Sequence, residues 1–125
     1  MLEFSISGLP PSYNRHFQII YALRECHLTP EAHLFKNRVK MSIPPYEFKE
    51  DAKLVIEIEY HANFVCKNGK NRKIDLQNLD KLLIDAIFEK LGIDDSMIWH
   101  MTAEKIQSIA SEKTVVRLRE ACGAV

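Results

Sequence analysis

Residues 53–92 read KLVIEIEYHANFVCKNGKNRKIDLQNLDKLLIDAIFEKLG and contain the two patterns that decide the fold. In Lys53–Tyr60, apolar and polar residues alternate, which is typical of a strand with one buried face. In Leu76–Leu91, apolar residues recur at helical spacing, and Gly92 follows as an expected C-cap. A strand followed by an amphipathic helix predicts a helix packed on a sheet.

The flanking sequence adds further elements on both sides. Thr29-Pro30-Glu31 is typical of a helix start, and this helix should run to about Met41, before Pro44-Pro45. The stretch Phe17–Leu28 is apolar enough for a strand pair or a helix, and we favour extended structure. Other strands are expected at Leu2–Ser7, near Met97–Gln107 and near Thr114–Arg119. The order strand, helix, strand, helix, strand, strand predicts an α+β fold, with two helices packed on a small mixed sheet.

Length and composition are those of one globular domain spanning residues 1–125. With 46% hydrophobic and 27% charged residues, the chain is not of the disordered, coiled-coil or disulfide-scaffold class. There is no run of about 18 apolar residues and no signal-peptide pattern, and the three cysteines form no C-x-x-C pair. These features favour a cytoplasmic location. The 17 basic and 17 acidic residues cancel, which at first sight argues against a nucleic-acid partner.

Short acidic side chains stand at both ends of the second predicted helix. Asp75 lies at its start, and Asp94-Asp95 lie in the turn that follows it. Short carboxylates suit a hard divalent cation such as Mg²⁺, which takes the rest of its ligands from water and phosphate. Lys81 shares the polar side of the helix with Asn78 and Asp85, and its charge would stabilise a phosphoryl group.

A basic loop precedes this helix, with four positive residues: Lys67, Lys70, Arg72 and Lys73. Acids beside a basic loop are the layout expected of a metal-dependent phosphodiesterase that acts on a polyanion. The same residues also have a purely structural interpretation. Asp75 would be an N-cap, Asp94-Asp95 would form a turn, and the loop would simply connect two elements. Spacing alone leaves both interpretations open.

Several of these residues follow each other in a recognisable order. Asp75-Leu76-Gln77-Asn78 is followed by Lys81, then by Asp85-Ala86, Asp94-Asp95 and Lys105, and Leu9–Arg15 reads LPPSYNR. This order resembles the RusA family of Holliday-junction resolvases. The family pattern is D-x-D-N-x-x-K, a D-A pair, a later D-D and a further lysine, after an opening P-P-S-x-N turn.

The resemblance implies a homodimer that binds four-way DNA junctions and makes paired symmetric nicks with Mg²⁺, in recombination and repair. A bacterial or prophage origin is expected. By matched position, Asp75 and Asp95 would be catalytic metal ligands, Asp94 and Gln77 further ligands, and Lys81 the catalytic lysine. Two residues would support the site: Asn78 and Asp85. The DNA-binding residues expected from the opening turn, the basic loop and the motif are Asn14, Arg15, His16, Lys67, Lys70, Arg72, Lys73 and Lys105.

Gln77 departs from the family pattern, which has an aspartate at this position. An amide oxygen can ligate Mg²⁺, but it brings no charge and cannot act as a base. The alternative function is therefore a junction-binding protein with weak or no cleavage. A third hypothesis is a dimeric scaffold whose acids are only caps and turns.

Overall fold

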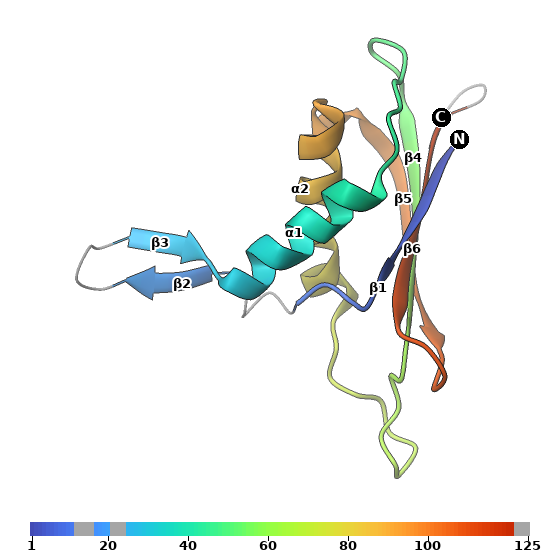
Figure 1. Ribbon diagram of the computed structural model, residues 1–125. Coiled ribbons are helices and arrows are strands. Elements are labelled where there is room, and N and C mark those ends of the chain that lie inside the picture. The colour runs from blue at the N-terminus through green and yellow to red at the C-terminus, as the bar shows by residue number, and fades with distance from the viewer. Residues whose placement is uncertain (12–16, 21–24, 122–125) are drawn as a thin grey trace.

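A computed structural model describes residues 1–11, 17–20 and 25–121. Two helices among these residues lie on one side of a sheet (Figure 1), which confirms the predicted α+β class. The elements are β1 (Leu2–Ser7), β2 (Phe17–Ile20), β3 (Glu25–Leu28), α1 (Pro30–Ser42), β4 (Leu54–Ala62), α2 (Leu76–Leu91), the short 3₁₀ helix η2 (Asp95–Met97), β5 (Ile98–Gln107) and β6 (Lys113–Glu120).

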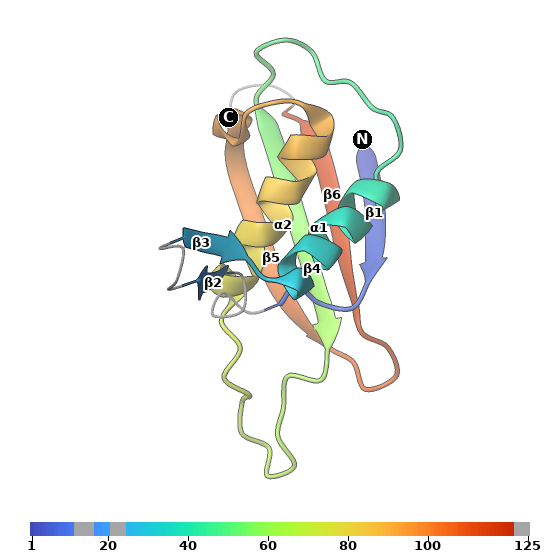
Figure 2. The same ribbon diagram turned by 60° about the vertical axis from the view of Figure 1, so that its left-hand side comes forward.

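The main sheet has the strand order β1-β6-β4-β5. β4 pairs with β5 in parallel and with β6 in antiparallel orientation, and β1 pairs antiparallel with β6. Because β4 and β5 are parallel, the chain must cross over between them, and α2 is that crossover (Figure 2). α2 therefore runs in the direction opposite to both strands, and β5 forms one edge of the sheet.

The core lies between the helices and one face of the sheet. Alternation along β4 buries Leu54, Ile56, Ile58 and Tyr60 on this face, as the sequence predicts. The two helices contribute apolar side chains from above: Ala32, Phe35, Val39, Leu79, Leu82, Leu83, Ala86, Ile87 and Phe88. Because both helices cover the same face, the other face of the main sheet carries most of its polar residues, together with apolar ones such as Val55 and Val115.

The ends of α2 are fixed by its flanking residues. Asp75 is the N-cap, and its carboxylate accepts a hydrogen bond of 3.0 Å from the amide of Gln77. Gly92 is the C-cap with φ of 69°, a left-handed conformation that favours glycine. The predicted helix ends are confirmed. The buried face of α2 includes the acidic residue Asp80, while the apolar Leu76 is only partly buried.

β2 and β3 form a separate two-stranded sheet, paired antiparallel with Phe17 opposite Leu28. The expectation of extended structure over Phe17–Leu28 is confirmed for these two strands. Their presence before α1 adds a strand pair that the predicted order of elements lacks. The reason is local: these short strands pair only with each other and carry no long alternating pattern.

Candidate functional site

Four of the expected site residues gather at the beginning of α2. Asp75 is the N-cap, and Gln77, Asn78 and Lys81 lie in the first two turns; all four are exposed. We call this group the α2-start site. Because one oxygen of Asp75 caps the helix, the expected capping role is confirmed, while the other carboxylate oxygen can serve a second purpose. A carboxylate has about four acceptor positions, so capping and cation binding are compatible.

The remaining expected acids lie at the other end of the helix. A surface pocket of about 470 Å³ is lined by Asp85, Phe88, Glu89, Gly92, Ile93, Asp94 and Asp95. We call it the α2-end pocket. One of its acids, Glu89, is held by Lys36 at 2.7 Å and Lys40 at 2.8 Å, and the Lys36 hydrogen bond is the main cause that lowers the pKa of Glu89.

Asp94 and Asp95 begin the short helix η2. The Asp94 carboxylate accepts a hydrogen bond of 2.8 Å from the amide of Ser96, and this bond lowers the pKa of Asp94. The expected turn-forming role of Asp94 is thus confirmed. Both acids are exposed, and a lowered pKa keeps Asp94 ionised over a wider pH range. An ionised carboxylate is the form that binds a divalent cation.

One chain does not bring the two groups of acids together. α2 has 16 residues, which at 1.5 Å per residue separates its ends by about 24 Å. Asp75 is the N-cap of this helix, and Asp94 follows its C-cap, so the two acids lie at opposite ends. Among the residues that the structure describes, no three histidine, cysteine, aspartate or glutamate side chains are placed to hold a metal ion. Asp85 also lies with the α2-end pocket and not with Asp75.

The basic loop leads directly into the α2-start site and extends away from the sheet (Figure 1). It folds back on itself through a bridge between Val65 and Asn71, and Gly69 makes the turn with φ of 82°. Arg72 donates a hydrogen bond of 3.1 Å to the carbonyl of Asn63, which fixes its position near the base of the loop. The lysines of the loop are all exposed: Lys67, Lys70 and Lys73.

Lys105 lies on β5, opposite Tyr60 of β4 in the register of the sheet. Its ammonium group is 5.4 Å from the centre of the Phe64 ring, at the end of the molecule from which the basic loop extends. The structure therefore places Lys105 with the basic loop. The three other expected DNA-binding residues lie outside the described residues: Asn14, Arg15 and His16.

A model of the endodeoxyribonuclease RusA family matches residues 9–119 of the 125-residue chain. This chain belongs to the RusA family. The resemblance of the motifs is thereby confirmed, and family membership implies endonuclease activity on Holliday junctions. No curated protein matches the chain. Among the described residues, no helix is long and apolar enough to cross a membrane.

RusA resolvases generally depend on a divalent metal, and the oxygen donors of this chain suit such an ion. The carboxylates of Asp75, Asp94 and Asp95 and the amide oxygen of Gln77 are all hard ligands. Their chemistry fits Mg²⁺, but the fold of one chain divides them between the two ends of α2. A metal centre that uses all of these residues requires the residues at the start of α2 to meet the acids that follow its end.

Asp80 and Tyr60 are not among the site residues expected from the sequence, and the structure joins them by a buried hydrogen bond. Asp80 is 8% exposed, and its carboxylate accepts a hydrogen bond from the hydroxyl of the fully buried Tyr60. Burial raises the pKa of Asp80, and the negative charge of Asp75 raises it further, while the Tyr60 hydrogen bond lowers it. A signal was present: at about 100° per residue, Asp80 falls about 20° from Ile87, on the apolar side of α2.

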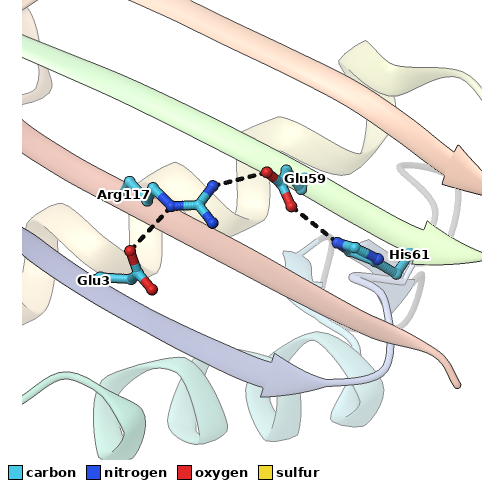
Figure 3. Close-up of polar contacts among 4 residues, drawn as sticks. All are labelled: Glu3, Glu59, His61 and Arg117. Atoms are coloured by element: carbon cyan, nitrogen blue, oxygen red, sulfur yellow. Dashed lines mark hydrogen bonds and ion pairs between the residues drawn. The ribbon is translucent and has the colours of Figure 1, made fainter.

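The face of the sheet away from the helices carries a chain of ion pairs (Figure 3). Arg117 on β6 bonds Glu3 at 3.0 Å and Glu59 at 2.7 Å, and Glu59 also bonds His61 at 3.0 Å. The Arg117 hydrogen bond is the main cause that lowers the pKa of Glu59. Arg117 lies between two glutamates, so this cluster connects β1, β6 and β4 and presents no net positive charge to DNA, in contrast to the basic loop.

Proposed function

We propose that this RusA-family protein is a Mg²⁺-dependent homodimer that resolves four-way DNA junctions by paired symmetric nicks, in recombination and repair. The observation that carries the proposal is the division of the family's acidic residues between the two ends of α2. A site divided in this way is incomplete in one chain and complete in a pair of chains that run in opposite directions.

The edge strand β5 supports such a pair. It is mostly exposed along its length, including Trp99 at 57% and Met101 at 39%. If two β5 strands paired antiparallel about a two-fold axis, the neighbouring α2 helices would also run in opposite directions. The α2-start site of one protomer would then approach the α2-end pocket of its partner. The sheet would continue across the dimer, which also removes an exposed edge.

In such a dimer, each composite site would contain Asp75 and Gln77 from one protomer and two acids from the other, Asp94 and Asp95. Bound Mg²⁺ would polarise the scissile phosphate and activate a water molecule. Lys81, two turns into α2, would stabilise the negative charge that develops on the phosphoryl oxygens. The lysines of the basic loop would hold the phosphate backbone next to the site.

Two sites related by a two-fold axis match the symmetry of the substrate. A four-way junction has approximate two-fold symmetry, and its resolution needs one cut on each of two equivalent strands. A homodimer provides two equivalent sites at a fixed distance. A monomer of this size, with a radius of gyration of about 14 Å, covers only one strand crossing.

The second candidate is a junction-binding protein with weak or no cleavage, and Gln77 is the residue that favours it. At an effective dielectric constant of about 20, two unit charges about 4 Å apart interact by about 4 kcal/mol before desolvation is counted. Without a carboxylate at this position, a cation would be held less tightly. Gln77→Asp separates the two candidates, because it should increase cutting strongly if weak cation binding is the defect.

The main test uses a labelled synthetic four-way junction with Mg²⁺ or with EDTA, and denaturing gels as readout. The wild-type protein should make paired nicks only with Mg²⁺. Asp75→Asn is a matched variant, because asparagine caps a helix as well as aspartate does. It should cut at least about 100-fold more slowly, with unchanged junction binding and melting temperature. Nicks in EDTA, or equal cutting by the variant, would contradict the proposal.

A further inference from the structure

The carboxylate of Asp80 is a buried acidic group, in a residue that is 8% exposed. Tyr60 donates a hydrogen bond to its Oδ1, and the described residues provide no hydrogen bond to Oδ2. Every fully buried side-chain oxygen of these residues has a hydrogen-bond partner. Since Oδ2 of Asp80 has none, it is not fully buried and contacts solvent. The carboxylate is therefore held in place on one side and open on the other.

Asp80 lies beside the α2-start site. It follows Gln77 by three residues on the same helix, and side chains at this spacing are neighbours on the helix surface. Asp75 is close enough to influence it, because the charge of Asp75 raises the pKa of Asp80. On the sheet below, Tyr60 lies next to Lys105 in the register of β4 and β5. Asp80 thus stands between the core and the residues expected to bind the cation.

The buried charge is costly for folding. Desolvation is the largest influence on Asp80, and the hydrogen bond from Tyr60 offsets only part of it. An apolar residue at this core-facing position would avoid the cost. Asp80 nevertheless stands beside a site in which Gln77 replaces a carboxylate. An effect of the Asp80 charge on that site explains its presence better than packing does.

We propose that Asp80, positioned by Tyr60, supplies to the cation site at the start of α2 the negative charge that Gln77 does not bring. Asp80 is then a positioning residue that acts on the cation through water, and not a direct ligand. The inference rests on the proposed function, since it requires that a divalent cation binds near Asp75. It adds a residue outside the family motif, in which the position of Asp80 is unspecified.

The test measures the affinity for Mn²⁺, used as a paramagnetic probe for Mg²⁺, by electron paramagnetic resonance without DNA. Asp80→Asn keeps an oxygen that accepts the Tyr60 hydrogen bond and removes only the charge. It should weaken Mn²⁺ binding on the order of 10-fold. Glu112→Gln, which removes an exposed acid beside β6, is the matched control and should bind Mn²⁺ as the wild type does.

A rescue experiment separates a direct charge effect from damage to the fold. Adding Gln77→Asp to Asp80→Asn should restore Mn²⁺ affinity to within about 2-fold of the wild type, because the charge returns one turn away. Wild-type affinity in Asp80→Asn, or a loss that Gln77→Asp does not restore, would overturn this inference and leave the proposed nuclease function intact. A wild-type protein that binds no Mn²⁺ and cuts no junction would overturn both.

Discussion

At the scale of single residues, Asp75 and Asp94 each combine two roles. Both carboxylates cap a helix, Asp75 through the amide of Gln77 and Asp94 through the amide of Ser96. Each cap uses one hydrogen bond and fixes the side chain at a helix start, where the backbone dipole favours negative charge. The structural interpretation of these acids is therefore confirmed without excluding the chemical one. A capped carboxylate is already oriented before any cation arrives.

Asp80 gives a prediction on pH dependence. Its pKa in the folded state is raised above the ordinary value of 3.8, mainly by burial. The folded state therefore binds this proton more tightly than the unfolded state does, and Asp80 favours folding only while it is protonated. Its contribution to the free energy of unfolding should be lost as the pH rises from about 3.8 through the raised value.

The measurement is urea unfolding of the wild type and Asp80→Asn between pH 3 and pH 8. The variant should be the more stable protein at neutral pH, and its advantage should shrink as the pH falls through the raised pKa of Asp80 toward the ordinary value of 3.8. An advantage that does not change with pH would show that the ionised carboxylate carries no folding cost.

At the scale of elements, α2 determines where the chemistry can take place. Its two caps set its length, and its direction against β4 and β5 follows from the parallel pairing of those strands. Glu89 holds it to α1 through Lys36 and Lys40. As a result the α2-start site and the α2-end pocket are held apart by a rigid helix. The proposed dimer would bring the two sites together while the helix stays folded.

Gly92 tests the importance of the end of this helix. With φ of 69° it adopts a backbone conformation that alanine adopts at a cost of about 1–2 kcal/mol, and a Cβ atom there would meet nothing within 4 Å. Gly92→Ala should therefore lower the free energy of unfolding by about 1 kcal/mol through backbone strain alone. Lys90→Ala, an exposed change in the same turn, should have an effect below about 0.5 kcal/mol in the same urea titration.

At the scale of the whole molecule, the net charge of zero is the sum of positive and negative regions that have different roles. The basic loop and Lys105 lie at one end, the acids of the α2-end pocket lie at the other, and Arg117 is paired with two glutamates on the open face of the sheet. In the proposed dimer, the basic end of one protomer would lie beside the acidic end of its partner. DNA would then be attracted to the places where the composite sites form.

Subunit mixing tests the composite site directly. Asp75→Asn and Asp95→Asn should each be inactive as homodimers. In a dimer of one Asp75→Asn chain and one Asp95→Asn chain, one composite site contains both substitutions and the other contains neither. The intact site should restore nicking. With random exchange, about a quarter of all sites should be intact, and single nicks should replace paired ones. If exchange is demonstrated and no nicking appears, both acids of each site come from one chain.

Much of the fold follows from local patterns. The alternation in β4, the apolar stripe of α2, Asp75 and Gly92 at its ends, and Thr29 as the N-cap of α1 were all predictable, because capping and periodicity depend on residues a few positions apart. The pair β2–β3 was recognised only as extended, since short strands carry a weak pattern. Trp99 lies on the edge strand β5 and is 57% exposed beside Lys53, an exposure that no local pattern specifies.

The sequence by itself determined the helices and strands, the basic loop and the motif that marks a RusA nuclease, because each depends on residues close together in the chain. Only the tertiary structure decided the strand order, the parallel pairing of β4 with β5 and the burial of Asp80 against Tyr60. These features join residues far apart in the sequence, and no local periodicity specifies them. The sequence already places Asp75 and Asp95 beyond opposite ends of one predicted helix, and the folded chain adds that its described residues do not bring these acids together.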